Sequence, residues 1–213
     1  MSVGTRDLPH LGPTPAMGQV FPVSHTCERA SAIVTTRRNS LNLILLSGGL
    51  DSALCLHRYG AALAIGFDYG QPHRIELDYA KRIAKRFKVK FERHQLNPIP
   101  LVNDVVFAGR NAVMLSTAAA IAQSRGLSAV VIGCNFSDAE RFADCRPAFI
   151  RSMNEAFKEA YGVTVHAPLL TTSKAQIVQE AWGAGLPETW TCYSPTKLKR
   201  PCGRCYSCKS LQS

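Results

Sequence analysis

Several absences narrow what this 213-residue chain can be. It has no run of about eighteen or more apolar residues, so we expect no membrane-spanning helix. Prolines interrupt the N-terminal region before any continuous apolar segment forms, so no secretory signal is expected and the cytoplasm is the predicted location. Acidic residues are scarce: 15 Asp and Glu stand against 25 Lys and Arg, a formal net charge of +10. This excess fits nucleic-acid binding as well as capture of an anionic small molecule, and does not choose between them.

A further absence concerns phosphate binding. The chain has no G-x-x-x-x-G-K-[ST] motif, so a Walker A loop is excluded. An apolar run, Leu43 to Leu46, ends instead in Ser47-Gly48-Gly49-Leu50-Asp51-Ser52. Paired glycines let backbone N–H groups converge on an anion, and a helix that begins at this turn adds its N-terminal dipole. The segment resembles the S-G-G-x-D-S signature of PP-loop ATP pyrophosphatases; the plainer interpretation is a glycine turn with Ser52 as a helix cap.

The remaining pattern predicts three regions. Residues 1–40, rich in Pro, Gly, Ser, Thr and Arg, are expected to be a loosely structured extension. Residues 41–190 alternate strands and helices, which predicts a doubly wound parallel α/β sheet, and residues 191–213 form a C-terminal tail. Residues 135–146 are expected to be a polar loop at the carboxyl end of a strand, where such sheets bind ligands. The expected strands are 41–46, 61–67, 89–94, 129–133 and 163–166, and the expected helices are 51–60, 74–87, 112–124, 148–161 and 173–182. A capping box is expected to start the last helix, with Ser173 as N-cap and Gln176 at its third position.

The C-terminal tail carries a cluster of cysteines. Cys202, Cys205 and Cys208 follow one another in two C-x-x-C steps, and Cys192 lies ten residues before the first. This spacing predicts a tetrahedral Zn²⁺ site, with a disulfide pair or a redox C-x-x-C as the alternative. Four thiolates leave no open position for water, so the zinc is expected to be structural and to hold the tail onto the sheet.

Basic residues recur along one predicted helix and the strand after it. Lys81, Arg82, Lys85, Arg86, Lys88 and Lys90 lie within ten positions of the sequence. A charged run at helical spacing is more often a solvated face than a binding surface, and we interpret it so.

Further motifs accompany the phosphate loop: Phe67-Asp68-Tyr69-Gly70-Gln71 with His73, Gly109-Arg110-Asn111, Asp144-Cys145-Arg146, and Thr191-Cys192-Tyr193 before the cysteine cluster. In this order, from about Leu41 to Cys208, they resemble the QueC family, the 7-cyano-7-deazaguanine (preQ0) synthases. The resemblance implies an ATP-dependent ligase of queuosine or related deazapurine biosynthesis. It would convert 7-carboxy-7-deazaguanine and ammonia to the nitrile through adenylated intermediates.

The resemblance also implies site residues. Asp51 is expected to help hold Mg²⁺, although a helix N-cap is an equally good interpretation of it. Asp144 would accept from guanine-like N–H groups and Arg146 would hold the carboxylate, so the expected catalytic set is Asp51, Asp144 and Arg146. Cys145 is either a nucleophile or a packed thiol. The expected ATP-binding residues are Leu46, Ser47, Gly48, Gly49, Leu50, Asp51, Ser52, Ala53, Leu54, Cys55, Leu56, Asp68 and Arg110, with Tyr69, Gln71 and His73 beside them.

Two other functions stay open at this point. A PP-loop enzyme that attaches a deazaguanine to tRNA, DNA or a protein would share every motif, and its positive charge would serve docking of the acceptor. A zinc-ribbon binding module without enzymatic activity is a further alternative, which the intact phosphate loop argues against. Whether the chain forms a homodimer is also open.

Overall fold

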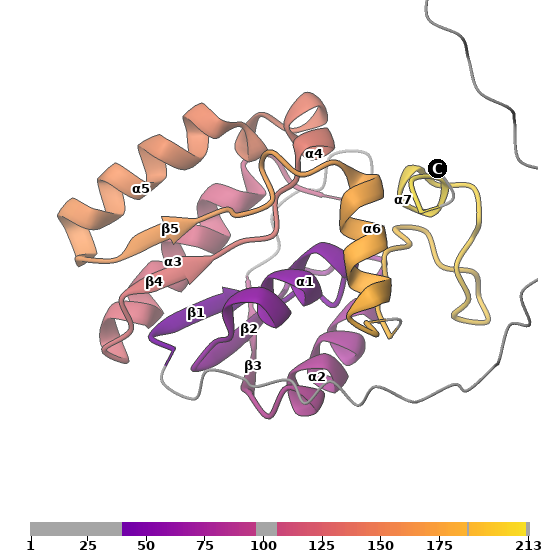
Figure 1. The fold of residues 1–213 in the computed structure, drawn as a ribbon, viewed down its shortest axis with the longest axis horizontal. Coiled ribbons are helices and arrows are strands. Elements are labelled where there is room, and N and C mark those ends of the chain that lie inside the picture. The colour runs from indigo at the N-terminus through magenta and orange to yellow at the C-terminus, as the bar shows by residue number, and fades with distance from the viewer. Residues whose placement is uncertain (1–39, 97–105, 187, 212–213) are drawn as a thin grey trace, which may run out of the picture. The chain divides into compact units, whose positions relative to one another are not determined.

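The computed structural model describes residues 40–96, 106–186 and 188–211, so the predicted extension lies outside the described residues except for Ser40. In these ranges a five-stranded sheet has the order β3-β2-β1-β4-β5, and every neighbouring pair is parallel (Figure 1). The doubly wound parallel sheet is therefore confirmed. The strands are β1 (Asn42–Leu45), β2 (Leu63–Asp68), β3 (Lys90–Gln95), β4 (Ala129–Val131) and β5 (Thr164–His166).

Helices cover both faces of the sheet. Successive side chains of a strand point to opposite faces, and in the central strands the side chains on both faces are apolar and pack against helices. Leu43 and Leu45 belong to a core cluster with α3 (Arg110–Ser124) and α5 (Pro147–Tyr161). Ile44 and Leu46 belong to a second cluster with α1 (Leu50–Tyr59), α2 (Glu76–Arg86) and α6 (Lys174–Gly183). Strand β1 is thus buried on both faces, as its continuous apolar run predicts. None of the helices in the described ranges is both long and apolar enough to cross a bilayer.

One expectation about the local structure was wrong. Residues 135–146 are not a plain loop, because they contain the helix α4 (Phe136–Arg141) and a 3-10 turn (η1, Ala143–Cys145). A capping box starts α4: the Asn135 side chain accepts from the Asp138 N–H at 3.1 Å, and Asp138 accepts from the Asn135 N–H at 3.2 Å. Such a box usually carries Glu or Gln at its third helical position. Because this position holds the shorter Asp138, the sequence pattern did not reveal the box. The predicted box of Ser173 and Gln176 at the start of α6 is confirmed.

The order of the strands reverses at β1, which pairs with β2 on one side and with β4 on the other. The crevice at the carboxyl ends of two such strands is where doubly wound sheets bind ligands. The segments that meet there pack very closely. Gly48 has φ +91°, and a Cβ on it would overlap the carbonyl oxygen of Glu76; a Cβ on Gly133 would lie 2.9 Å from the Ser52 nitrogen. The phosphate-loop backbone is therefore fixed between α2 and the end of β4.

Candidate active site

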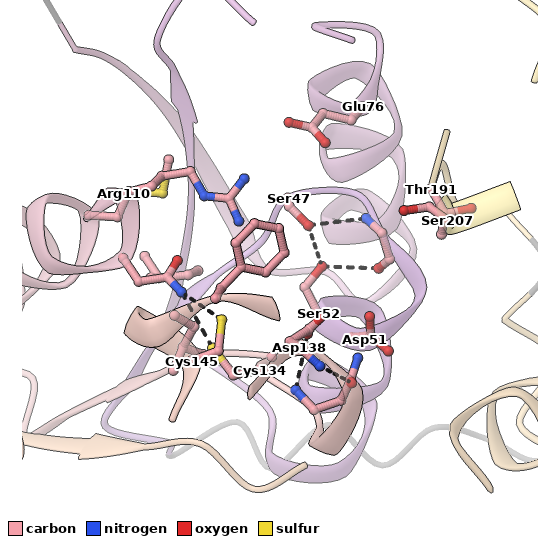
Figure 2. Close-up of a pocket in the computed structure, with 18 of the residues that line it drawn as sticks. Ser47, Asp51, Ser52, Glu76, Arg110, Cys134, Asp138, Cys145, Thr191 and Ser207 are labelled. Carbon is pink, nitrogen blue, oxygen red and sulfur yellow. Dashed lines mark hydrogen bonds between the residues drawn. The ribbon is translucent and has the colours of Figure 1, made fainter. Parts of the chain in front are cut away.

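A cavity of about 190 Å³ opens at the carboxyl ends of the central strands (Figure 2). Ser47, Gly49, Asp51 and Ser52 of the phosphate loop form one wall. The ends of β2 and β4, the start of α3 and helix α4 form the others. The C-terminal segment closes the cavity with Trp190, Thr191, Tyr193, Tyr206 and Ser207.

Hydroxyl groups hold the phosphate loop in shape. The Ser52 Oγ donates to the Gly49 carbonyl at 3.0 Å, and the Gly49 N–H donates to the Ser47 Oγ at 3.3 Å. The two hydroxyls lie 3.2 Å apart, and these contacts appear as dashed lines in Figure 2. Of the predicted ATP-binding run, Leu46, Ser47, Gly49, Asp51 and Ser52 line the cavity. Gly48, Leu50, Ala53, Leu54, Cys55 and Leu56 are buried behind it and support the loop.

Asp51 lies in the first turn of α1, whose N-cap is Gly49, so the interpretation of Asp51 as a helix cap is wrong. Its two carboxylate oxygens accept from Lys174 Nζ at 2.8 and 2.9 Å. Asp138 is nearby, and its pKa is raised by burial and by the negative charge of Asp51. All three side chains line the cavity, which therefore has a charged end beside the phosphate loop. Sequence reasoning missed Lys174, because only the fold brings α6 beside α1.

The other end of the cavity is formed by Arg110 and Glu76, again side chains from different helices. Arg110 is the first residue of α3, and its Nη1 donates to the Tyr69 hydroxyl at 3.3 Å. Glu76 is the first residue of α2 and was also missed by sequence reasoning. Burial raises the pKa of Glu76 to about 7, although a hydrogen bond from Gln71 and the charge of Arg110 oppose this rise. A buried carboxylate that titrates near neutrality and lines a cavity is typical of a functional site.

Besides the buried residues behind the loop, three charged residues of the predicted site do not line the cavity: Asp68, Asp144 and Arg146. Asp68 is buried between Arg93 and Arg74, and accepts from the Gly70 N–H at 3.1 Å. Burial alone would raise the pKa of Asp68, but these hydrogen bonds and charges lower it overall.

Asp144 and Arg146 are likewise absent from the cavity wall. The Asp144 carboxylate accepts from the backbone N–H of Asn111 at 2.9 Å and so caps the start of α3. Arg146 is exposed and donates to the Ala139 carbonyl at 3.3 Å. Of the three expected catalytic residues, only Asp51 lines the cavity.

Two buried thiols line the cavity near the start of α3. The Asn111 side-chain amide donates to the Cys145 sulfur at 3.2 Å and contacts the Cys134 sulfur at 3.7 Å. A hydrogen bond with Cys145 and burial raise the pKa of Cys134 well above its ordinary value. Because burial and Cys145 favour the neutral thiol of Cys134, the pair fits a packed role better than that of a nucleophile.

The four cysteines of the tail converge. Sulfur atoms of Cys192, Cys202, Cys205 and Cys208 all lie within 4.8 Å of one another, and those of Cys192 and Cys205 are 4.0 Å apart. A tetrahedral zinc with Zn–S bonds of about 2.3 Å requires S–S distances of about 3.8 Å. Backbone N–H groups of Cys202 and Cys205 point at the Cys192 and Cys202 sulfurs, at 3.2 and 3.3 Å, as suits thiolates. Gly203 makes the turn between them with φ +70°. The cluster fits a zinc ion.

Trp190, directly before the tail, joins it to α2 and to the phosphate loop. The Trp190 N–H donates to the Gly48 carbonyl at 2.8 Å, and its indole packs on Tyr79 with ring centres 5.4 Å apart. The indole Nε1 donates to the Cys192 carbonyl at 2.8 Å. Farther on, the Arg141 guanidinium of α4 stacks over the Tyr206 ring at 3.9 Å. The segment that carries the four cysteines therefore forms one wall of the cavity.

Comparison with known proteins agrees with these features. The model of the family described as queuosine biosynthesis protein QueC matches residues 41–105 and 97–212. The chain is 36% identical over 204 residues to the 7-cyano-7-deazaguanine synthase of Novosphingobium aromaticivorans, covering 79% of this chain and 87% of that protein. It is 37% identical over 202 residues to the synthase of the same name from Rhizorhabdus wittichii, covering 78% of this chain and 87% of that protein.

Proposed function

The chain belongs to the QueC family, and from this premise we propose that it is an ATP-dependent 7-cyano-7-deazaguanine synthase. The observation that carries the proposal is one cavity that joins the S-G-G-L-D-S loop, with Asp51 and Lys174, to the half-buried Arg110 and Glu76. One end suits the phosphates of ATP and the other suits a polar, carboxylate-bearing heterocycle. A zinc-ribbon module without activity would not need such a cavity.

The reaction replaces both oxygens of a carboxylate by one nitrogen. The carboxylate attacks the α-phosphorus of ATP, which releases pyrophosphate and leaves an acyl adenylate. Ammonia displaces AMP and gives the amide. The amide oxygen attacks the α-phosphorus of a second ATP, which releases a second pyrophosphate, and loss of the second AMP with the two remaining N–H protons leaves the nitrile. Each adenylation turns a poor oxygen leaving group into AMP.

The phosphate end is assigned to residues that line it. Ser47, Gly49 and Ser52 present hydroxyl and N–H groups to the phosphates, with the α1 dipole behind them. Lys174 adds a positive charge that the loop itself lacks. Asp51 is the carboxylate placed to hold Mg²⁺, a hard cation that offsets the charge of the pyrophosphate when it is bound.

At the substrate end Arg110 takes the part that sequence reasoning gave to Arg146. Its planar guanidinium can pair with two oxygens of a carboxylate, and it lines the cavity where Arg146 does not. Asp144 becomes a positioning residue, because it caps the helix that Arg110 begins. Asp68 becomes one as well, since it pairs with Arg93 and Arg74 beside the end of β2.

The proposed zinc ion is structural. Four thiolates fill its tetrahedral shell and leave no site for substrate, so the chemistry does not pass through it. Its contribution is to hold the tail in the position from which Thr191, Tyr193 and Ser207 line the cavity. Free thiols and a need for ATP both favour the cytoplasm as the place of action. The proposed partners are 7-carboxy-7-deazaguanine and ammonia.

A second candidate function rests on the exposed face of α2. Lys81, Arg82, Lys85 and Arg86 are all exposed there, which would suit the phosphates of a nucleic-acid acceptor. In that case the enzyme would transfer an activated deazaguanine to the acceptor instead of to ammonia.

The test is to incubate the protein with ATP, Mg²⁺, ammonia and 7-carboxy-7-deazaguanine and to follow products by mass. The proposal expects the nitrile together with AMP and pyrophosphate, at two ATP per nitrile. Product that appears only when RNA or DNA replaces ammonia, with salt-sensitive binding of that nucleic acid, would support the second candidate instead. ADP and phosphate without AMP would overturn both.

A further inference from the structure

Glu76 is a carboxylate that lines the cavity, and the proposed binding of ATP and substrate assigns it no role. It is the first residue of α2, and its side chain is 13% exposed. The missing Cβ of Gly48 lets the backbone of Glu76 pack directly on the phosphate loop. In Figure 2 Glu76 and Arg110 lie on one side of Ser47, and Asp51 and Asp138 lie on the other. Glu76 therefore lies where a substrate carboxylate activated by the loop would be.

The Gln71 side chain, whose amide oxygen and nitrogen both form hydrogen bonds, holds Glu76 in place. The Gln71 Nε2 donates to Glu76 Oε1 at 3.1 Å and to the Phe67 carbonyl at 3.0 Å, and Gln71 Oε1 accepts from the Tyr69 N–H at 2.9 Å. Gln71 is 1% exposed, so this arrangement is shielded from water. Because Gln71 engages Oε1, the oxygen that these contacts leave for the substrate is Oε2.

The groups that face Glu76 come from four elements. His73 precedes α2 and its Nε2 lies 3.7 Å from Glu76 Oε1, but burial lowers the pKa of His73 to about 4 and keeps it neutral. Tyr69 follows β2 and Tyr193 belongs to the tail; burial raises the pKa of each phenol. Arg110 of α3 is the charged group on this side among the described residues. Burial raises the pKa of Glu76 more than the positive charge of Arg110 lowers it. The resulting pKa of about 7 suits proton transfer at neutral pH.

The chemistry requires a proton acceptor at this place. Ammonia carries three hydrogens, and the nitrile nitrogen carries none. One proton leaves when ammonia displaces AMP to form the amide, and two more leave as the adenylated amide loses AMP. All three depart from the same nitrogen, while both AMP groups depart from the same carbon. One base beside that nitrogen can serve every step.

We propose that Glu76 is the general base that accepts the protons leaving the substrate nitrogen, in amide formation and again in nitrile formation. This inference rests on the proposed synthase function. The carboxylate takes each proton on Oε2 and releases it to solvent between steps, so no oxidant or further reactant is needed.

The other titratable groups of the cavity fit the task less well. Asp138 accepts from the Asn135 N–H and lies with Asp51 and Lys174 at the phosphate end. Cys134 is held in its thiol form by Cys145 and by burial. His73 does not line the cavity.

Two partial reactions separate this proposal from the proposed function. The exchange of labelled pyrophosphate into ATP, dependent on 7-carboxy-7-deazaguanine without ammonia, reports adenylation alone, which needs no base at nitrogen. The conversion of the amide, 7-amido-7-deazaguanine, to the nitrile reports the later proton losses without added ammonia. We compare wild type, Glu76→Gln, Glu76→Asp and a matched control, Asp78→Asn, which alters an exposed carboxylate of the same helix.

In wild type the rate of the amide reaction should rise with pH through about 7 and then level off. Glu76→Gln should lower that rate about 100-fold or more and remove the inflection, while exchange stays within about 3-fold of wild type. Glu76→Asp should recover part of the rate, and Asp78→Asn should behave as wild type. If Glu76→Gln converts the amide within about 5-fold of wild type, or loses exchange as severely as conversion, the assignment of Glu76 is overturned. Wild-type protein without substrate-dependent exchange would instead refute the synthase function.

Discussion

Lys174 donates from its Nζ to both carboxylate oxygens of Asp51, at 2.8 and 2.9 Å, across 123 residues of sequence. The pair joins the first turn of α6 to the first turn of α1 directly beside the phosphate loop. Its side chains are 15% and 22% exposed, so the charges are screened less than at a surface. Bound ATP would place phosphate oxygens near Lys174 and a metal ion near Asp51, and both charges would then serve the ligand.

Replacing Lys174 by Met should raise the KM for ATP about tenfold or more, because a fixed positive charge near the phosphates is lost. The matched control is Arg58→Met. Arg58 joins the same two helices through Glu180 but lies outside the cavity wall. We expect the control to lower Tm and leave the KM for ATP unchanged. Equal effects of the two variants on the KM for ATP would argue that Lys174 only links the helices.

Asp51→Asn should reduce turnover by about 100-fold or more and leave the circular dichroism spectrum unchanged. A neutral amide is a poor ligand for Mg²⁺, and Gly49 rather than Asp51 caps α1, so the helix survives. The measurement is kcat as a function of Mg²⁺ concentration, in which the variant should require more metal. Full activity at ordinary Mg²⁺ would exclude the metal-binding role of Asp51.

Purified protein should contain one zinc per chain, and a chelator should lower both Tm and activity, because the zinc-held tail lines the cavity. Cys205→Ser should reduce zinc content, while Cys134→Ser, outside the cluster, should not. Elemental analysis and thermal melts check both. Zinc-free protein with unchanged Tm, or an intact melting curve for Cys205→Ser, would reject the site.

Glu76→Gln should stabilise the ligand-free protein, and increasingly so as the pH rises from about 5 to about 8. The folded pKa of Glu76 is raised from 4.5 to about 7, so its contribution to stability is fully present below about 4.5 and is lost as pH rises through about 7. The neutral amide of Gln at position 76 does not ionise, so the variant does not lose this stability as the pH rises. The Tm of the variant relative to wild type should therefore increase between pH 5 and pH 8, by an equivalent of at most about 3 kcal/mol. Asp78→Asn should show no such trend, and a difference that shrinks with pH would contradict the burial of Glu76.

Gly48→Ala should destabilise the protein far more than Gly70→Ala. Both glycines have positive φ, +91° and +82°, so each alanine carries a conformational cost of about 1 to 2 kcal/mol. Only at Gly48 would the new Cβ also overlap the backbone of Glu76; nothing lies within 4 Å at Gly70. Urea unfolding of both variants measures the difference. Similar losses would show that the contact between the loop and α2 adjusts easily.

Short-range patterns predicted most of the fold. The continuous apolar run of β1 and the alternation of strands with helices specify a parallel sheet, because only burial on both faces accommodates such strands. The capping box of Ser173 and Gln176 predicted the start of α6, because both of its hydrogen bonds lie within four residues of the sequence. Asn135 and Asp138 make an equivalent box with a shorter side chain, and their helix was missed.

The sequence by itself determined the phosphate loop, the family and the four-cysteine cluster, since each is recognised from the residue types of short motifs and from their order along the chain. The tertiary structure alone decided which distant side chains reach the cavity. Lys174 and Glu76 enter it because α6 and α2 pack on the face of α1, whereas Asp144 turns to the backbone of Asn111 and Arg146 remains exposed. Side-chain direction depends on how helices pack across the sheet, and no local spacing encodes that packing.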